Sequence, residues 1–481
     1  MGTTSPEILV ELDRSKPRGL RAQIEDGLRT AIRSGRLAPG TRLPSSRALA
    51  GDLGVTRGVV VDAYEQLAAE GYVTTVQGSG TRVNDVGDID VGDHATARRS
   101  AGRSPDRTPT GPGFVPPSPT DVVHDFRTGL PDLGLFPRAA WARATRAALA
   151  TMPDADLGYH TGAGLPGLRT ALASYLGRVR GVACTPDQVV VCNSFGHGFS
   201  LVLRALVDRG ITEIAVEVPG YDDPRDQIAW AGARVRPVPV DDRGIRVADL
   251  AATGVRAVVV TPAHQAPTGV VLTPDRRTEL VEWARAADGL VIEDDYDAEY
   301  RYDRHPVGAL QGVAPDRVVY QGTLSKSLAP GVRLGWLVAP PEVVEGILAG
   351  RKATDHMTTA ILQATFASFL EAGDLDRHLR RSRRVYRERR DALMAALAEH
   401  LPEVRTQGVS AGLQAYVTLP DGWDAADVIE RAARHGVGVY QPADELMDPD
   451  QRARALVLGF GTLRPGQIGD GIRSLAEAIR A

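Results

Sequence analysis

The 481-residue sequence is poor in cysteine, in lysine and in long apolar runs. Its two cysteines, Cys184 and Cys192, cannot form a disulfide framework, and no Cys/His spacing indicates a metal site. We therefore expect buried, reduced thiols and no bound metal. No run of roughly eighteen apolar residues occurs, and residues 1–16 lack the charged-then-apolar pattern of a secretory signal. These absences predict a cytoplasmic protein that makes no membrane contact.

The chain is too long for one compact core, so we expect at least two domains. Residues 85–120 divide it, because they are rich in Gly, Pro, Ser, Thr and Asp and show almost no apolar periodicity. That composition predicts a flexible linker. The formal net charge of -4 argues against a blanket affinity for polyanions, although charge can be distributed unevenly along a chain.

The segment before the linker, residues 1–84, has the pattern of an α+β winged helix-turn-helix. Apolar residues recur every four positions over 20–32 and predict an amphipathic helix. Two further helices begin after an N-cap at Ser45 or Ser46 and after an N-cap at Thr56, with the short turn GDLGV between them. The stretch GYVTTVQGSGTRV then predicts a hairpin that forms the wing.

A winged helix binds DNA by placing its second helix in the major groove. Arg57 opens that helix, where a guanidinium reaches guanine or a phosphate, and Arg47 in the preceding helix is placed for the DNA backbone. The motifs LPSSR, GVTR and GSGT in residues 16–83 resemble the winged-helix domain of GntR-type bacterial regulators. The resemblance implies operator DNA as a partner, contacted by Arg47, Thr56, Arg57 and Gly78.

After the linker, short apolar runs alternate with helical stretches, which predicts a largely parallel sheet with helices on both faces. Ligands of such sheets bind at the carboxyl ends of the strands. We expect this large α/β domain over residues 121–341. Residues 342–481 combine longer helical segments with a few strands and predict a smaller α+β subdomain.

One of only three lysines lies in the stretch TLSKSLAPGVRLGW. Lys326 directly follows the predicted strand RVVYQGT, whereas Lys16 lies near the N-terminal flank and Lys352 has no strand before it. An uncharged lysine condenses with an aldehyde, and pyridoxal 5'-phosphate (PLP) is the common biological aldehyde held in this way. Lys326 is therefore the candidate attachment point.

Other predicted strand and helix ends supply the remaining parts of a PLP site. Asp294, at the end of a strand, can keep the pyridine nitrogen protonated, and Tyr296 can hydrogen-bond the ring hydroxyl. Tyr221 follows another strand and offers a ring for stacking. For the phosphate, the candidates are the charge of Arg333, the hydroxyls of Thr323 and Ser325, and the backbone N–H groups of a helix start at Ser194, Phe195 and Gly196.

This ordered set resembles the fold-type I aminotransferases, and with the N-terminal segment it resembles the MocR subfamily of GntR regulators over nearly the whole chain. The carrying stretches are FRTGLPDLGLFP, GYHTGAGLPGLR, VEVPGYDDPR, HQAPTG, EDDYDAEYRY and SKSLAPGVRLGW. The resemblance implies an internal aldimine on Lys326, Asp294 on the pyridine nitrogen, Tyr296 on the ring hydroxyl, Tyr221 stacked and Arg333 on the phosphate. It also implies a head-to-tail homodimer in which Tyr159 reaches the partner's phosphate.

Two departures from the aminotransferase pattern bear on the effector. Ala266 occupies the place of the asparagine before Pro-Thr-Gly, so we expect His264 or Gln265 to contact the ring hydroxyl instead. Val457 stands where aminotransferases and amino-acid-sensing relatives place the arginine that grips a substrate carboxylate. Arg464 and Arg225 are the alternative partners for such a carboxylate.

The sequence therefore predicts a PLP-dependent transcription regulator whose aminotransferase-like part is a small-molecule sensor, with no catalytic residue assigned. Because Val457 replaces the guanidinium, we expect PLP itself to be the effector, as in relatives that activate vitamin B6 synthesis; an amine or amino acid is the alternative. Effector binding would shift the placement of the winged helices. The rival hypotheses are an active aminotransferase with an accessory DNA-binding domain and a scaffold that retains a dead cofactor fold.

Overall fold

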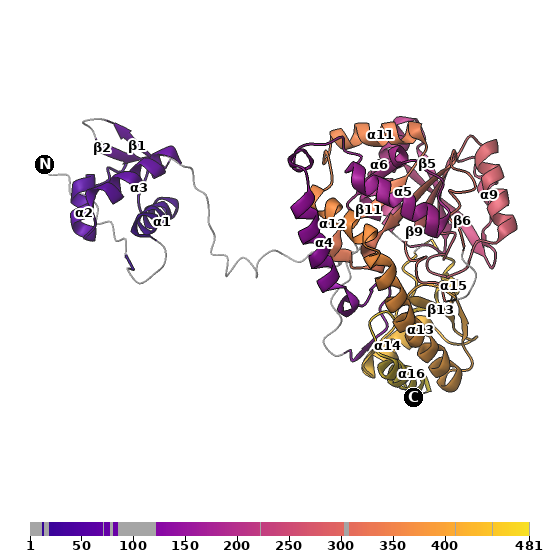
Figure 1. Ribbon diagram of the computed structural model, residues 1–481. Coiled ribbons are helices and arrows are strands. Elements are labelled where there is room, and N and C mark those ends of the chain that lie inside the picture. Colours follow the sequence, from indigo (N-terminus) through magenta and orange to yellow (C-terminus); the bar gives the residue numbers. More distant parts are fainter. Residues whose placement is uncertain are drawn as a thin grey trace. The chain divides into compact units, whose positions relative to one another are not determined.

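The computed structural model describes residues 12–13, 19–70, 72–76, 80–84, 122–221, 223–302, 307–408, 410–444 and 446–480. They fall into two compact units, divided between residues 108 and 109, and each unit is described by itself (Figure 1). The predicted linker and Gly78 of the wing lie outside the described residues. The domain boundaries expected from the sequence stay predictions.

The first unit contains helices α1 (Leu20–Arg33), α2 (Ser46–Leu53) and α3 (Arg57–Ala69) and the antiparallel strands β1 (Val73–Val76) and β2 (Gly80–Val83). Its core is formed by the apolar faces of these helices, where Ile24, Leu28 and Leu67 are fully buried. The periodicity of the sequence therefore identifies the buried faces correctly, as expected for amphipathic helices.

The turn between α2 and α3 follows from two local signals. The Ser45 side chain accepts a hydrogen bond from the Ala48 amide at 3.2 Å, so Ser45 rather than Ser46 caps α2. Gly54 is the C-cap of α2, and its φ of 61° is the left-handed conformation that glycine adopts without strain. Thr56 then caps α3 as predicted, but its hydroxyl makes no capping hydrogen bond.

The second unit is built on an eight-stranded sheet (Figure 1). In spatial order its strands are β4 (Val189–Cys192), β11 (Gly335–Val338), β10 (Val318–Thr323), β9 (Leu290–Asp295), β8 (Ala257–Val260), β5 (Glu213–Val218), β6 (Arg234–Asp241) and β7 (Gly244–Ile245). β11 and β7 run antiparallel to their neighbours, and the other strands are parallel. The apolar runs QVVVC, EIAVEVPG, AVVVTP, GLVIEDDY and RVVYQGT form β4, β5, β8, β9 and β10 as predicted. β6, β7 and β11 are not predicted, and in β6 two prolines weaken the strand signal.

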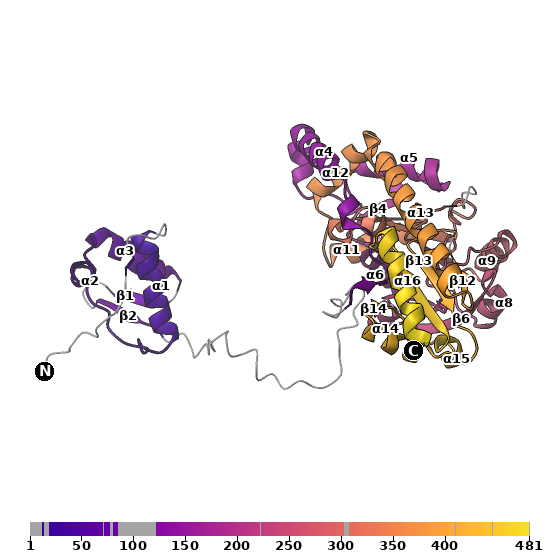
Figure 2. The same cartoon turned by 90° about the horizontal axis from the view of Figure 1, so that it is seen from below.

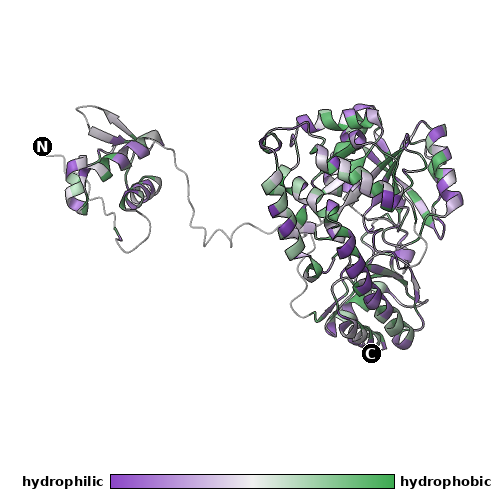
Figure 3. Ribbon diagram, in the orientation of Figure 1, coloured by the Kyte–Doolittle hydropathy of each residue, from purple (hydrophilic) through white to green (hydrophobic). Residues whose placement is uncertain are grey.

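Helices cover both faces of this sheet. One layer contains α6 (Phe195–Asp208), α7 (Asp223–Trp230) and α11 (Pro341–Lys352), and the other contains α5 (Pro166–Arg180), α8 (Val247–Ala252), α9 (Pro274–Ala286) and α12 (Ala360–Glu371). Within β9, Ile292 packs in the first layer and Val291 in the second. Successive strand residues thus serve opposite layers, as the pleat requires. Figure 3 shows hydrophobic and hydrophilic residues mixed along the helices, as two-faced helices require.

The C-terminal part forms a smaller α+β subdomain. Its antiparallel sheet contains β12 (Arg405–Gln407), β13 (Gln414–Thr418) and β15 (Ala455–Gly459), packed against α13 (Asp374–His400), α14 (Ala425–Arg434) and α16 (Pro465–Arg480). α13 and α16 lie side by side (Figure 2). β14 (Val437–Gly438) pairs in parallel with β3 (His124–Asp125), so the chain just after the predicted linker pairs with this subdomain.

Short elements and one further helix complete the second unit: η1 (Leu133–Leu135), α4 (Arg138–Thr151), η2 (Asp154–Leu157), η3 (Pro186–Gln188), α10 (Leu324–Ser327), η4 (Pro330–Val332) and α15 (Pro449–Arg452). Among the described residues, no helix is long and apolar enough to cross a membrane. In the same part of the chain, no group of three or more His, Cys, Asp or Glu side chains is placed to hold a metal ion.

Candidate cofactor site and DNA-binding surface

The end of β9 sends three consecutive carboxyl groups to opposite faces of the sheet. Glu293 accepts hydrogen bonds from two backbone amides, and Asp295 forms a buried ion pair with Arg180 at 2.7 Å. Asp294 lies between them in the sequence and points to the other face, where its Oδ2 accepts a hydrogen bond from the hydroxyl of Tyr221. Because of the pleat, Asp294 alone of the three faces Tyr221, while Glu293 and Asp295 make contacts within the fold.

Asp294 has the surroundings of a carboxyl group that expects a cationic partner. Its side chain is buried, and Oδ1 has no hydrogen-bond partner among the described residues. Burial raises the pKa of Asp294 to about 8, although the Tyr221 hydroxyl and the charge of Lys326 act in the opposite direction. A buried carboxyl with one open oxygen fits a ring N–H that brings its own positive charge, as the protonated pyridine nitrogen of PLP does.

Lys326 lies in α10, directly after β10. Its Nζ donates a hydrogen bond to the carbonyl oxygen of Gly129 at 2.6 Å, and a Cβ at residue 129 would lie 3.3 Å from Nζ. The backbone at Gly129 is also left-handed, with a φ of 78°. The structure thus brings Lys326 within electrostatic range of Asp294 as predicted, and a glycine loop nearly 200 residues away holds the amine. Gly129 lies in the stretch FRTGLPDLGLFP, but nothing in that stretch indicates a contact with Lys326.

The first turn of α6 offers backbone groups for a phosphate. Ser194 caps the helix, and its Oγ accepts a hydrogen bond from the His197 amide at 3.1 Å. The amides of Phe195 and Gly196 lie in the same turn, where N–H groups have no acceptor within the helix. A helix start of this kind attracts a doubly negative group.

Side chains near this turn add hydroxyls and positive charge. The Oγ1 of Thr323 and the Oγ of Ser325 lie 2.9 Å apart at the start of α10. Arg333 is exposed and has a left-handed φ of 53°. Burial lowers the pKa of His197, and the charge of Arg333 lowers it further, which places Arg333 within electrostatic range of the first turn of α6. His197 is a member of this group that the sequence reasoning does not name, although it lies in the stretch NSFGHGFS.

Tyr221 reaches the site from the loop after β5. Its ring lies 6.4 Å from the ring of Phe195, with the two planes tilted by 56°, and its hydroxyl binds Asp294. The sequence predicts a stacking ring at this position. The structure adds a hydrogen bond to the carboxyl group, which ties Tyr221 to the same partner as the expected ring nitrogen.

Of the two side chains expected to replace the asparagine, only His264 lies beside Tyr296. Its Nδ1 is 3.0 Å from the Tyr296 hydroxyl and 2.9 Å from an Asp297 oxygen. Gln265 is used elsewhere: its amide donates to the carbonyl oxygen of Pro219 at 2.8 Å, and its oxygen accepts from Thr268. Asp297 is a missed member of this group, because nothing in the stretch EDDYDAEYRY distinguishes it from the neighbouring acids.

The C-terminal subdomain presents no arginine at position 457. Val457 is buried beside Tyr416, Met447 and Ala455. Arg225, one of the two alternative partners for a carboxylate, forms an ion pair with the fully buried Asp444 at 2.5 Å.

The second alternative partner, Arg464, is exposed beyond the end of β15. Of the two, Arg225 is therefore already paired within the fold.

Tyr159 does not join the site within this chain. It is 93% exposed, an unusual state for a tyrosine. Three exposed leucine and isoleucine side chains belong to elements that precede or pack near it: Leu149 in α4, Leu157 in η2 and Ile361 in α12. α4 and α12 pack against each other.

The first unit presents arginines to solvent at the predicted positions. Arg47 and Arg57 are both exposed, and the Nε of Arg57 donates to the Oγ of Ser46 at 3.3 Å. A third exposed arginine, Arg42, lies against the wing, where a Cβ at Gly80 would approach its Nε to 3.0 Å. No sequence pattern indicates Arg42, since it lies in neither predicted helix. Gly78 cannot be placed because it lies outside the described residues.

Two family models match the chain. Residues 20–83 match the model of bacterial regulatory proteins of the gntR family. Residues 123–441 match the model of aminotransferase class I and II. The fold class predicted from the motifs is thereby confirmed.

Known proteins of both kinds are similar to this chain. A probable rhizopine catabolism regulatory protein, MocR, from Rhizobium meliloti is 34% identical over 98% of this chain and 96% of its own. The HTH-type pyridoxine biosynthesis transcriptional regulator PdxR of Corynebacterium glutamicum is also 34% identical, over 90% of both chains. Among solved structures, a multiple substrate aminotransferase from Thermococcus profundus superimposes with a TM-score of 0.68 at 29% identity, over 76% of this chain and 92% of its own.

Proposed function

The chain belongs to the MocR subfamily of GntR-type transcription regulators, and we propose that it senses PLP bound at Lys326 and adjusts its binding to operator DNA accordingly. The observation that carries the proposal is that Lys326 lies within electrostatic range of a buried Asp294 whose Oδ1 has no hydrogen-bond partner among the described residues. A carboxyl group of this kind is costly to bury unless a ligand brings the matching charge.

Each residue of the site has a separate task in holding the cofactor. When bound, PLP supplies an aldehyde carbon and an electron-withdrawing ring. Lys326 provides the attachment amine, Asp294 fixes the protonated ring nitrogen, and Tyr221 covers the ring while keeping its hydrogen bond to Asp294. Tyr296, backed by His264, reaches the ring hydroxyl.

The phosphate would be held by the N-terminal turn of α6 together with charge and hydroxyl groups. The amides of Phe195 and Gly196, the capping Ser194, the hydroxyls of Thr323 and Ser325, and the guanidinium of Arg333 form this set. Gln265 is not proposed as a cofactor contact, because its side-chain amide is hydrogen-bonded to Pro219 and Thr268.

We propose PLP itself as the effector rather than an amino acid. The α-carboxylate of an amino acid is bound by a bidentate pair with a guanidinium. At the position where aminotransferases carry that arginine, this chain has the buried Val457. Arg225 is committed to Asp444, whose charge is fully buried. The PdxR relative is named for pyridoxine biosynthesis, which is consistent with a regulator of vitamin B6 synthesis.

The DNA contacts would come from the exposed arginines of the first unit. Arg57 and Thr56 stand at the start of α3, which enters the major groove, and the Thr56 hydroxyl is not used as a cap. Arg47 lies in α2 and would contact the DNA backbone. Gly78 is kept as a proposed wing contact.

A head-to-tail homodimer would give the exposed Tyr159 a partner. Leu149, Leu157 and Ile361 are also exposed within one chain, and large exposed apolar side chains of this kind are covered where two chains meet. In this arrangement the Tyr159 hydroxyl of one chain would reach the phosphate held by the other.

Adding PLP to the purified protein tests the proposal. We expect a visible absorption band, and borohydride reduction followed by peptide mass analysis should locate the cofactor on Lys326. A protein that stays colourless and carries no trapped cofactor would leave a DNA-binding protein with a non-binding scaffold.

An active aminotransferase is the second candidate. The Aromatic-amino-acid aminotransferase 1 of Thermococcus litoralis is 29% identical over 75% of this chain, and Lys326 and Asp294 are the groups that such chemistry needs. We propose a sensor instead, because the carboxylate-binding arginine is missing. Turnover of an amino acid at roughly 1 to 1000 per second would favour the enzyme.

A further inference from the structure

His264 lies in a hydrogen-bond arrangement that favours a charged imidazole. Its side chain is almost fully buried, with Nδ1 2.9 Å from a carboxylate oxygen of Asp297 and Nε2 3.2 Å from the carbonyl oxygen of Gly408. Both partners are acceptors. A hydrogen on each ring nitrogen satisfies both acceptors, and an imidazole with two N–H groups is the imidazolium form; the Tyr296 hydroxyl, 3.0 Å from Nδ1, then accepts from the same N–H as Asp297.

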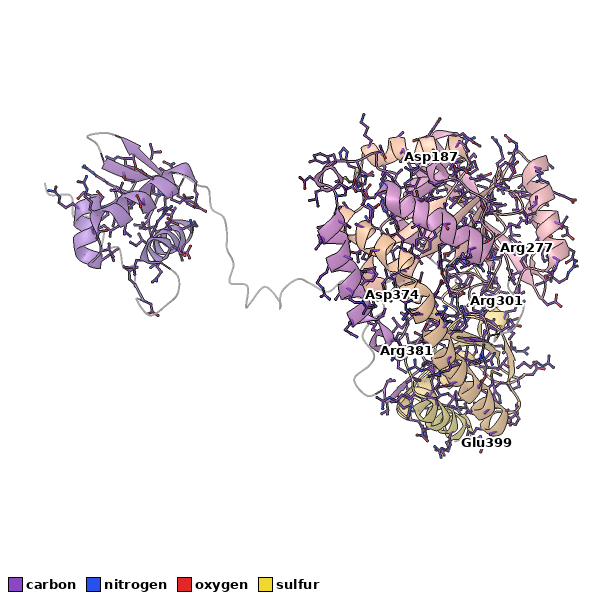
Figure 4. The ribbon with its side chains drawn as sticks, viewed as in Figure 1. Asp187, Arg277, Arg301, Asp374, Arg381 and Glu399 are labelled. Atoms are coloured by element: carbon purple, nitrogen blue, oxygen red, sulfur yellow. The ribbon has the colours of Figure 1, made fainter. Side chains whose placement is uncertain are left out.

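The charged groups around His264 are consistent with this form. Burial lowers the pKa of His264, but the Asp297 carboxylate outweighs burial, so the net direction is upward. Arg301, labelled in Figure 4, opposes the charge, and its Nη1 donates to the carbonyl oxygen of Ala263 at 3.1 Å. Tyr296 is a further titratable group at this point, and its pKa is raised well above the usual value, mainly by burial and also by the nearby carboxyl groups of Asp297, Asp294 and Glu217. Among the described residues, Asp297 is thus the anion that pairs with His264.

Three glycines hold the imidazole in place from the C-terminal subdomain and the loop after β8. A Cβ at Gly412 would overlap the ring of His264, and a Cβ at Gly269 would overlap Gly408. The loop between β12 and β13 therefore packs directly on the imidazole. The ring has no space to turn away from Tyr296 unless this loop moves.

We propose that His264 is a charged positioning residue, whose imidazolium, paired with Asp297, holds the Tyr296 hydroxyl at the cofactor ring and ties that hydroxyl to the C-terminal subdomain through Gly408. The hydroxyl oxygen of Tyr296 lies 3.0 Å from Nδ1. The inference rests on the proposed binding of PLP, in which Tyr296 contacts the ring hydroxyl. It adds a fixed positive charge behind that contact and a connection from the ring site to the subdomain.

The pH dependence of the visible band of the cofactor-loaded protein tests this role. A Tyr296 hydroxyl held by His264 would donate a hydrogen bond to the ring oxygen, which favours the deprotonated form of the loaded site, and replacing His264 removes that support. We expect His264→Gln to raise the midpoint pH of the band by about one unit, a tenfold change in proton affinity. The exposed His435 provides the matched control, because His435→Gln should leave the midpoint unchanged.

A double substitution separates positioning through Tyr296 from a general effect on the fold. If His264 acts through the Tyr296 hydroxyl, His264→Gln should shift the midpoint much less in a Tyr296→Phe protein than in the unaltered one. An unchanged midpoint in the single variant, or equal shifts with and without the Tyr296 hydroxyl, would overturn the proposal.

Nitrogen NMR on histidine-labelled, cofactor-free protein gives an independent readout that needs no variant to bind PLP. The chain has 10 histidines, and the His264 signals are identified by their loss in the His264→Gln spectrum. We expect both ring nitrogens of His264 to be protonated at pH 7.5, and only one after Asp297→Asn. A singly protonated ring in the unaltered protein would contradict the proposal. A missing cofactor band alone would contradict only the proposed function.

Discussion

The two units of this protein use their polar side chains in opposite ways. In the first unit, Arg47 and Arg57 are exposed and wait for an external polyanion. In the second unit, Asp294 and His264 are 3% and 2% exposed, and a charged group at that depth is tolerated only with a matching partner. Removing a charged side chain should therefore weaken DNA binding in the first unit, whereas in the second unit it should change cofactor binding or folding stability.

Replacing the attachment amine should have the largest effect, because Lys326→Ala removes the group that bonds to the cofactor. We expect complete loss of the visible band and of borohydride trapping. Lys352→Ala is the matched control, since Lys352 is exposed at the end of α11 and should leave the band intact. Retention of the band without Lys326 would show that the cofactor is held elsewhere.

Loss of a buried ion pair should have the next largest effect, on stability. Asp444 is fully buried. Its carboxylate accepts a hydrogen bond from the Gly220 amide and forms an ion pair with Arg225. Arg225→Ala leaves that carboxylate unpaired and should reduce the free energy of unfolding by about 3–5 kcal/mol, measured by urea denaturation.

The control is Arg454→Ala, since Arg454 and Asp421 are 46% and 91% exposed. Its expected effect is about 0–1 kcal/mol. Equal losses in the two variants would contradict the contrast between buried and exposed charge.

The stability of the cofactor-free protein should depend on pH through Asp294. Its pKa is raised to about 8 in the folded chain, mainly by burial, so its contribution to stability is present below the ordinary aspartate pKa and is lost as pH rises toward 8. Asp294→Asn removes this dependence. The variant should gain stability relative to the unaltered protein between about pH 4 and 8, by on the order of a few kcal/mol, with little further change above that range.

Thermal unfolding at several pH values measures this difference. Loading with PLP should reduce it, because the ring nitrogen supplies the partner that the carboxyl lacks. A difference that stays constant with pH would mean that Asp294 is ionised throughout.

On the exposed side, Arg57→Ala should weaken operator binding by about 1–3 kcal/mol, roughly five- to more than a hundredfold, and leave the cofactor band unchanged. Arg21→Ala serves as the control, because Arg21 already pairs with Glu25 at 2.6 Å on α1. Fluorescence anisotropy with an operator fragment measures both. Equal affinity in the Arg57 variant and the unaltered protein would remove α3 from the proposed interface.

Local patterns predict the parts of the site that stand at the ends of strands and helices. Asp294, Lys326 and Tyr221 follow apolar runs that form β9, β10 and β5, and parallel strands bring their carboxyl ends to one edge. The capping of α2 and α3 follows from residue type in the same way, although only the structure decides between Ser45 and Ser46.

Contacts between distant segments could not be predicted. The carbonyl oxygen of Gly129 accepts from Lys326 across nearly 200 residues of sequence. The carbonyl oxygen of Gly408, in the C-terminal subdomain, contacts His264 of the large domain. The choice between His264 and Gln265 is of the same kind, because adjacent residues in a loop point in directions that only the packed fold determines. Asp297 lacks any signal of its own among four nearby acids.

Operator affinity measured with and without PLP, in the unaltered protein and in Lys326→Ala, tests the central claim most directly. A sensor predicts that saturating PLP changes the affinity of the unaltered protein by a factor of about 5 to 150 and leaves that of the variant unchanged. Identical operator affinity with and without PLP, in a protein shown by its absorption band to be fully loaded, would contradict it.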